Sequence, residues 1–134
     1  MSLKIRIITP DKIVWDKTTT EVILPSTTGP VGILNDHAPL ITALDIGVLR
    51  IKTGDNWEPI VVLGGFAEID DNNVVVLVNG VEVIKKGNIP KAFDDVTDAS
   101  LALENAKTDK EKLKAAQNLK RVAARAQALS FYPN

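Results

Sequence analysis

The sequence predicts an all-β sandwich of about eight to ten short strands, followed by an antiparallel hairpin of two helices. Up to about residue 83, runs rich in β-branched residues alternate with Gly, Pro, Asn and Asp. After residue 87 glycine is absent, and Ala, Leu, Lys and Glu dominate. The chain has 134 residues, 45% of them hydrophobic, which is enough for one compact core and a small appendage. We therefore expect a sandwich over residues 1–87 and a helical hairpin over residues 88–134.

The predicted strands are short, and several alternate between apolar and polar residues. Alternation is clear at 4–7 and 48–52, so these strands are expected to bury one face and expose the other. Such strands predict two sheets packed face to face. Clusters of Asp and Asn at 55–56 and 70–73 are natural hairpin turns, because both residue types tolerate a positive φ. The expected strands are 3–8, 12–16, 20–24, 31–34, 39–44, 47–52, 57–63, 65–69 and 73–78.

Two helices are expected in the second part. Asn88 is placed to cap the first helix, with Pro90 in its first turn. Thr108 and Glu111 fit a capping box, in which the threonine hydroxyl accepts from the Glu111 backbone while the carboxylate reaches back. The second helix therefore begins near residue 109. The expected apolar stripes are Ala92, Val96, Ala99 and Leu103 on the first helix, and Leu113, Ala116, Leu119, Ala123, Ala126 and Leu129 on the second.

The two predicted helices carry opposite charge. Residues 89–106 hold one base and four acids, whereas residues 107–129 hold seven bases and two acids. Alanine dominates the second stripe, which permits close approach of the two helices but buries far less apolar area than leucine would, so the hairpin should be marginally stable. Two interpretations remain open: a two-state element that presents a basic stripe to an acidic partner when it opens, and a permanently folded hairpin with an ordinary charged face.

Composition excludes several classes of function. The net charge is minus one, so no overall field attracts nucleic acid or an anionic membrane. The absence of cysteine excludes disulfides and thiolate sites. The first fifteen residues do not resemble a secretory signal, and we expect the mature chain to start near Met1. The longest uncharged stretch, residues 22–35, is too short and too rich in Pro and Gly to cross a bilayer, so we expect only indirect membrane association.

No catalytic or cofactor site is predicted. The chain lacks a phosphate-binding loop and a dinucleotide fingerprint. Ser26, Asp36 and His37 do not form a plausible triad, because adjacent Asp36 and His37 would point apart in an extended chain. The Asp and Asn cluster at 70–73 lacks the ligand spacing of a calcium loop. We therefore expect no catalytic residue, no cofactor and no metal.

Two residues leave alternatives open. His37, the single histidine, is either bonded locally in a loop or placed at an interface. Phe66 lies in a strand run, where filling of the sandwich core is the favoured interpretation and an interface contact the minority one.

The stretch 24–44, LPSTTGPVGILNDHAPLITAL, joins apolar residues to turn residues and glycines that permit close approach of a partner. Together with GGFAEI at 64–69 and the charged helical tail, it closely resembles the epsilon subunit of F-type ATP synthases. The resemblance covers essentially the whole chain. The LPSTTG segment and the helical tail are more similar to those of plastid and cyanobacterial members than to those of respiratory bacteria.

The resemblance implies a non-catalytic subunit of the central stalk, held between the gamma subunit and the ring of c subunits and rotating with them. By motif, the loop residues Pro30, Val31 and Gly32 match the part that faces the c-ring, whereas His37 and Thr42 match the part that faces gamma. The implied location is peripheral on the thylakoid membrane, on the stromal or cytoplasmic side. The alternative is the cytoplasmic face of a bacterial plasma membrane.

The resemblance also implies that residues 88–134 are a regulatory arm. In the family the arm lies folded against the sandwich, or extends along gamma toward an acidic loop of the catalytic beta subunits and restrains ATP hydrolysis. The bases expected to contact the alpha and beta subunits are Lys107, Lys110, Lys114, Arg121 and Arg125.

Some bacterial members bind ATP through an Ile-Asp-x-x-Arg-Ala pattern, but residues 89–93 here read IPKAF, without the acid and the arginine. ATP binding is therefore not expected from that pattern, although Arg121 and Arg125 could still attract phosphate. Two other classes of function remain: a free-standing adaptor whose hairpin docks onto an acidic protein, and a nucleotide sensor in which the ligand holds the hairpin closed.

Overall fold

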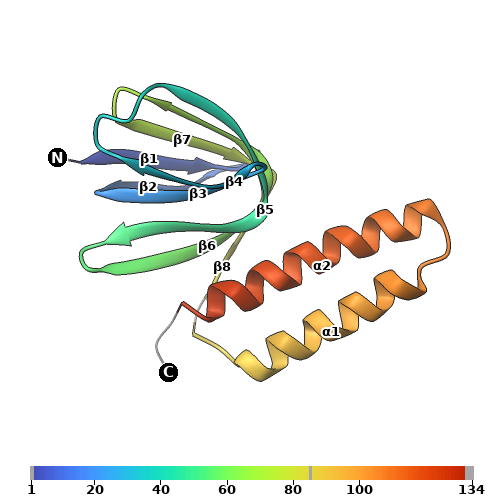
Figure 1. The fold of residues 1–134 in the computed structure, drawn as a ribbon. Helices are drawn as coiled ribbons and strands as arrows, with labels where there is room; N and C mark the ends of the chain where they lie inside the picture. The colour runs from blue at the N-terminus through green and yellow to red at the C-terminus, as the bar shows by residue number, and fades with distance from the viewer. Residues whose placement is uncertain (1, 85, 132–134) are drawn as a thin grey trace.

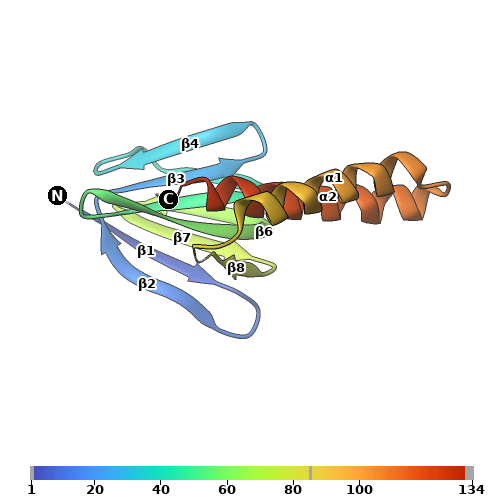
Figure 2. The same cartoon turned by 90° about the horizontal axis from the view of Figure 1, so that it is seen from below.

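The computed structural model describes residues 2–84 and 86–131, and it confirms the predicted β-sandwich with two C-terminal helices (Figure 1). The hairpin of helices projects from one side of the strand part, as both views show (Figures 1 and 2). The elements are β1 Leu3–Ile8, β2 Ile13–Thr19, β3 Glu21–Ser26, β4 Gly29–Leu34, β5 Leu40–Thr53, β6 Asn56–Asp70, β7 Asn73–Val78, β8 Val81–Val83, α1 Ile89–Asn105 and α2 Asp109–Leu129.

The strands form one hydrogen-bonded sheet in the order β2-β1-β7-β6-β5-β3-β4, with β8 paired to β6. Neighbouring strands are antiparallel except β1 and β7. Side chains from β1, β3, β4, β5, β6 and β7 share one buried cluster, so the sheet folds over on itself to enclose a core. Leu3, Ile5 and Ile7 are fully buried, which confirms the alternation expected in the first strand.

In two places, a pair of predicted strands forms one long strand in the structure. The runs 39–44 and 47–52 are both part of β5, and 57–63 and 65–69 are both part of β6. Where the predicted runs 57–63 and 65–69 join, Gly64 and Gly65 bend β6 instead of ending it, since their φ values are 80° and 149°. A Cβ atom at Gly65 would clash with the backbone of Leu77. The short strand β8 was not among the predicted runs, because a strand of three residues carries almost no periodic signal.

The predicted hairpin turns are present, with one shifted by a residue. Asp71 and Asn72 connect β6 to β7 with positive φ values of 49° and 62°, as the Asp and Asn cluster predicts. The turn between β5 and β6 consists of Gly54 and Asp55, not Asp55 and Asn56. Gly54 has a φ of 64°, a conformation that glycine adopts without steric cost, and Asn56 is already part of β6.

The caps of both helices are as predicted, with one difference. The Asn88 side chain accepts from the Lys91 backbone at 3.1 Å, and the Thr108 hydroxyl accepts from the Glu111 backbone at 3.1 Å. The Glu111 carboxylate reaches back to the backbone N–H of Lys107, at 3.1 Å, one residue before the cap.

The predicted apolar stripe of α2 is partly wrong. Leu113 is 61% exposed and Ala123 is exposed, whereas Val122 and Ala124 are buried. The prediction assumed a helix that packs only against α1. In the structure the C-terminal part of α2, with Ala124, Ala128 and Leu129, packs against β5 and β6, whereas Leu113 lies near the start of the helix. Figure 2 shows that the far end of the hairpin projects beyond the sandwich.

Candidate interaction surfaces

The residues assigned by resemblance to the c-ring side lie in a strand, not in a loop. Pro30, Val31 and Gly32 are part of β4, which among the described strands pairs with β3 alone. Pro30 and Gly32 are exposed, and Val31 packs partly against the core. The strand therefore presents a free edge with small apolar residues, a surface on which another chain can lie closely.

His37 lies in the connection between β4 and β5. Its Nδ1 atom is 2.7 Å from the carbonyl oxygen of Ala38, and because a carbonyl only accepts, Nδ1 carries the proton. This leaves Nε2 available to an outside group. Asp36, with a φ of 65°, donates its backbone N–H to the Asn72 side chain at 2.7 Å, so the connection is tied to the turn between β6 and β7. The local bond and the interface interpretation of His37 are therefore compatible.

Thr42 is occupied by an internal hydrogen bond. Its hydroxyl lies 2.9 Å from that of Ser26, which in turn lies 3.1 Å from that of Thr28. The neighbours of Thr42 along β5 point to the opposite face, and Ile41 is 73% exposed there. A partner that contacts this outer face meets Ile41 and Ala43 rather than Thr42.

Phe66 is 59% exposed, so the interpretation of Phe66 as a core residue is wrong. The bend at Gly64 and Gly65 turns this part of β6 so that Phe66 faces outward while Ala67 and Ile69 are buried. Through cross-strand pairing, Phe66 is part of a line of apolar side chains that runs across five neighbouring strands. We call this set the apolar row: Ala43, Phe66, Leu77, Ile8 and Ile13.

The apolar row has the features of a protein interface. Leu77 and Ile13 are 53% and 55% exposed, and an open groove of about 660 Å³ runs beside Phe66 and Leu77. Isolated exposed apolar side chains are ordinary, but a contiguous row across neighbouring strands is a feature of contact surfaces. The sequence signal was available in the alternation of 65–69, where Phe66 is out of phase with Ala67 and Ile69.

The helical hairpin docks on the sandwich through α2. Its docking face is made mostly of alanines, with Ala124, Ala128 and Leu129 in one buried cluster with Val48 of β5 and Val61 of β6. Alanine buries little area, so at about 25 cal/mol per Å² this contact stabilises the docked position far less than a leucine seam would.

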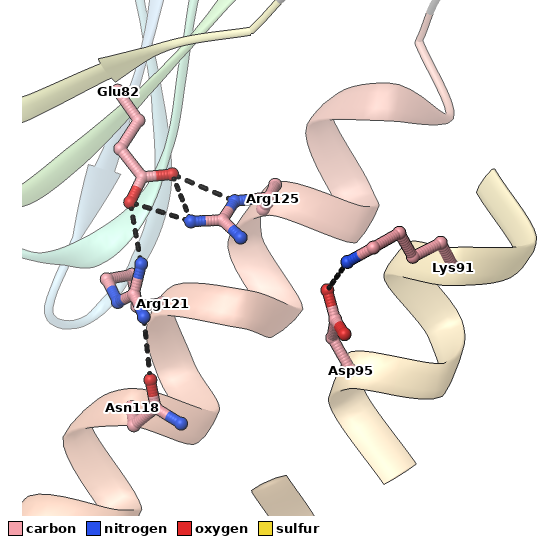
Figure 3. A network of polar contacts seen from close by, with 6 residues as sticks. All are labelled: Glu82, Lys91, Asp95, Asn118, Arg121 and Arg125. Carbon is pink, nitrogen blue, oxygen red and sulfur yellow. Dashed lines mark hydrogen bonds and ion pairs between the residues drawn. The ribbon is translucent and has the colours of Figure 1, made fainter. Parts of the chain in front are cut away.

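A single carboxylate, Glu82 of β8, accepts from two arginines of α2 (Figure 3). Arg125 binds it in a bidentate manner, with Nε 3.0 Å from Oε2 and Nη2 3.1 Å from Oε1. Arg121 donates from Nη1 to Oε1 at 2.9 Å and from Nη2 to Asn118 at 2.8 Å. We call Glu82, Arg121 and Arg125 the Glu82 clamp.

The clamp is partly shielded from water, with side-chain exposures of 23% for Glu82 and 33% for Arg125. Burial raises the pKa of the Glu82 carboxyl, but the hydrogen bonds and positive charge of Arg125 and Arg121 outweigh it and hold this pKa below its ordinary value. The same hydrogen bond from Arg125 to Glu82 raises the pKa of the guanidinium. Both groups are therefore charged at neutral pH, and the clamp is closed.

The five bases predicted to contact the catalytic subunits fall into two groups. Arg121 and Arg125 are bound by Glu82. The side chains of Lys107, Lys110 and Lys114 are exposed near the far end of the hairpin and form no ion pair with another described residue.

Sequence reasoning missed Glu82 and also the pair of Lys120 with Asp45, at 3.2 Å. The spacing of Arg121 and Arg125 by one helical turn was the available signal, since it places both on one face.

The described residues contain no cluster of three or more possible metal ligands. Among the two helices described, neither is long and apolar enough to span a membrane.

A family model described as the ATP synthase delta/epsilon chain β-sandwich domain matches residues 2–84. The match spans every strand of the sheet, including β4, β8 and the apolar row. This chain belongs to the epsilon-chain family of F-type ATP synthases. The resemblance seen in the motifs is thereby confirmed, and the family assignment covers both the sandwich and the hairpin of this epsilon-family chain.

Relatives from plastids and a cyanobacterium match along the full length. The chloroplastic ATP synthase epsilon chain of Gracilaria tenuistipitata var. liui is 49% identical over 134 residues, 100% of both chains. That of Pylaiella littoralis is 52% identical, covering 98% of this chain and 99% of its own. The ATP synthase epsilon chain of Synechocystis sp. is 51% identical, covering 96% of each.

Solved structures show the same fold at low sequence identity. A chain of the Euglena gracilis mitochondrial ATP synthase, in a structure of OSCP, F1 and the c-ring, matches with a TM-score of 0.82 and 16% identity, covering 96% of this chain and 81% of that one. A chain of the central stalk and c-ring of the Tetrahymena thermophila enzyme matches with a TM-score of 0.61 and 15% identity, covering 96% and 97%.

Proposed function

We propose that this chain is a non-catalytic rotor subunit that couples gamma to the c-ring and inhibits ATP hydrolysis through its C-terminal helices. The observation that carries the proposal is the mode of docking of the hairpin. A basic helix is held on the sandwich by the partly exposed carboxylates of Glu82 and Asp45 and by a small apolar contact rich in alanine, so it can be released at low cost. The family membership supplies the assembly in which such an arm acts.

The sandwich is proposed to couple the two partners through different surfaces. We assign the apolar row and His37 to the gamma subunit, because a contiguous row of exposed apolar side chains fits a permanent subunit contact. The free edge of β4, with Pro30, Val31 and Gly32, is assigned to the c-ring. Thr42 then supports the gamma side from within, through its bond to Ser26.

The hairpin is proposed to act as the inhibitory arm toward the alpha and beta subunits. In the docked position the exposed side chains of Lys107, Lys110, Lys112 and Lys114 are available to an acidic surface. Release frees Arg121 and Arg125 from Glu82 and Lys120 from Asp45, so undocking adds three bases to these four. Docked and released arms therefore differ in their attraction to an acidic loop, which is what a two-position regulator requires.

The proposed location is peripheral, on the stromal or cytoplasmic side of a thylakoid membrane, in keeping with the chloroplastic and cyanobacterial relatives. Membrane attachment is indirect, through the c-ring. A nucleotide-sensing role has no comparable support, because the guanidinium groups of Arg121 and Arg125, which could bind a phosphate, are both turned to Glu82.

The test is ATP hydrolysis by an alpha, beta and gamma complex that lacks this subunit, titrated with the full-length chain and with a truncation ending at Gly87. Inhibition by the full-length chain alone supports the inhibitory arm. If both forms bind gamma and neither inhibits, the chain is a structural coupler, and the proposal that its helices inhibit ATP hydrolysis is overturned. Failure of both to bind gamma overturns the rotor assignment and favours a free-standing adaptor.

A further inference from the structure

The end of α2 contacts the sandwich at a second place, on β5 rather than on β8. Phe131 follows the helix, and its ring centroid lies 4.6 Å from Cζ of Arg50 on β5. The same guanidinium lies 5.6 Å from the ring of Trp57 on β6. A guanidinium within about 6 Å of an aromatic centroid is attracted by the ring. Arg50 therefore bridges an aromatic side chain of the sheet and one at the end of the arm.

Phe131 is held in position by the helix and by apolar contacts. Its backbone N–H donates to the Ala128 carbonyl at 3.2 Å, which continues the last turn of α2. The half-buried ring also packs against the buried cluster that contains Val48 and Leu129. Its position is thus part of the docking face and not a loose end of the chain.

The contacts along β5 place α2 in one register. Lys120 Nζ lies 3.2 Å from Asp45 Oδ1. Further along α2 and β5, the Phe131 ring contacts the Arg50 guanidinium. The stretch from Asp45 to Arg50 spans about 16 Å at the rise of a strand, and that from Lys120 to Phe131 also spans about 16 Å at the rise of a helix. The two lengths agree, so both contacts form together only when α2 lies along β5 in this register.

We propose that Arg50, Trp57 and Phe131 form a latch that holds the end of α2 on the sandwich and resists salt, in contrast to the Glu82 clamp. This inference rests on the proposed function of the hairpin as a movable arm. The clamp is an ion pair between charges that water partly reaches, so dissolved ions screen it. The latch combines the burial of an aromatic ring with a short-range attraction between a cation and two rings, and neither is screened strongly.

The latch gives the arm two separate controls. Conditions that weaken ion pairs open the clamp but leave the end of α2 attached at Arg50, so the arm is retained near its docked register. Full release requires Phe131 to leave Arg50 as well. The latch therefore sets how much of the arm is released when the clamp alone is disturbed.

The experiment measures the docked fraction of the full-length chain by the distance between two spin labels. The chain contains no cysteine, so Lys12→Cys and Lys112→Cys, both at exposed positions, provide the labels. The compared variants are Arg50→Gln, Phe131→Ala and Glu82→Gln. Lys52→Gln is the matched control, because the Lys52 ammonium lies 5.8 Å from the same Trp57 ring but no contact with Phe131 is found.

We expect Arg50→Gln and Phe131→Ala each to raise the ratio of undocked to docked chain about two- to fivefold, to the same extent at low and at high salt. Glu82→Gln should raise it at low salt, with an effect that fades at about 1 M salt, where the Debye length is about 3 Å. The double variant Arg50→Gln/Phe131→Ala should exceed Phe131→Ala by little, because removal of the Phe131 ring already removes its contact with Arg50.

The latch is overturned if Arg50→Gln changes the docked fraction no more than Lys52→Gln, or if its effect fades with salt as that of Glu82→Gln does. Additive effects in the double variant also contradict it. Because the docked fraction is measured on the isolated chain, the result does not depend on whether the chain inhibits ATP hydrolysis. A salt-resistant latch in a chain that never inhibits ATP hydrolysis supports the latch and removes the inhibitory function.

Discussion

Glu82 shows how one residue can determine the position of a whole arm. Arg121 and Arg125 approach each other because the carboxylate lies near both of their guanidinium groups. Without that charge, two partly buried cations face one another and repel. No other described carboxylate forms an ion pair with either arginine, so the clamp depends on this single side chain.

Replacement of Glu82 by glutamine should therefore favour the undocked arm. We expect the docked state to lose about 1 kcal/mol, or roughly fivefold in population, because the pairs are partly exposed to water. In the reconstituted enzyme the E82Q variant should inhibit ATP hydrolysis at a lower concentration than the natural chain. Glu104→Gln, an exposed acid of α1, is the control. Weaker inhibition by E82Q would contradict the clamp as a restraint on the arm.

The direction of the Glu82 pKa shift sets the pH range of the clamp. The pKa in the docked state lies below 4.5, the ordinary value, so the carboxylate contributes to docking above that pH, and the contribution is lost as the pH falls through the docked pKa. The groups facing it are Arg121 and Arg125, with Asp95 interacting with Arg125. The hydrogen bond to Glu82 raises the pKa of Arg125, so this guanidinium stays charged throughout this range.

We therefore expect the docked fraction, measured with the label pair described above, to be unchanged by pH around neutrality and to fall only below 4.5. The acid step should vanish in E82Q. A step near neutral pH that survives in E82Q would assign the pH response to a group other than Glu82.

At the scale of elements, β5 and β6 determine where the functional surfaces lie. Each is long enough to contribute to both halves of the sandwich, and the glycine pair in β6 turns Phe66 outward. The bend also places Gly65 directly against the backbone of β7. The Ala43 and Phe66 end of the apolar row and the surface on which α2 docks, with Val48 and Val61, are therefore carried by the same two strands, on either side of the bend.

Gly65→Ala should destabilise the sandwich by about 2 kcal/mol or more, because a Cβ clashes with backbone atoms that cannot move away and the φ of 149° is strained for alanine. Gly32→Ala is the matched control, since its Cβ would meet nothing within 4 Å. Thermal unfolding followed by circular dichroism distinguishes them. Equal melting temperatures would mean that β6 can straighten without cost.

Phe66→Ser with Leu77→Ser tests the apolar row as an element. Both side chains are more than half exposed, at 59% and 53%, so we expect little change in melting temperature. Affinity for gamma should fall at least about tenfold, as for the centre of a buried contact. Val83→Ser, at a 61% exposed apolar residue of β8, is the control. An unchanged affinity for gamma in the double variant would move the proposed contact elsewhere.

For the whole molecule, the sandwich and the hairpin have different stabilities. The sandwich core is a closed cluster of large aliphatic side chains, whereas the hairpin docks through alanines, the Glu82 clamp and the Arg50 latch. The free energy of docking should therefore be much smaller than that of unfolding the sandwich. Hydrogen exchange should show the amides of α1 and α2 exchanging faster than those of β1 and β7. Equal protection would indicate one cooperative unit and no movable arm.

The sequence by itself determined the features that depend on near neighbours. Fold class, helix caps and the turn at Asp71 and Asn72 follow from periodicity, side-chain hydrogen bonds and φ preferences, which act over a few residues. The family also followed from local motifs, and full-length relatives confirm it.

Only the tertiary structure decided the features that join distant residues. Glu82 and Arg125 are 43 positions apart, and Lys120 and Asp45 are 75 apart. No local pattern encodes such pairs, because they depend on which face of α2 meets the sheet. For the same reason the stripe of α2 was partly mispredicted and Phe66 was placed in the core: both depend on how β6 bends and what then lies against it.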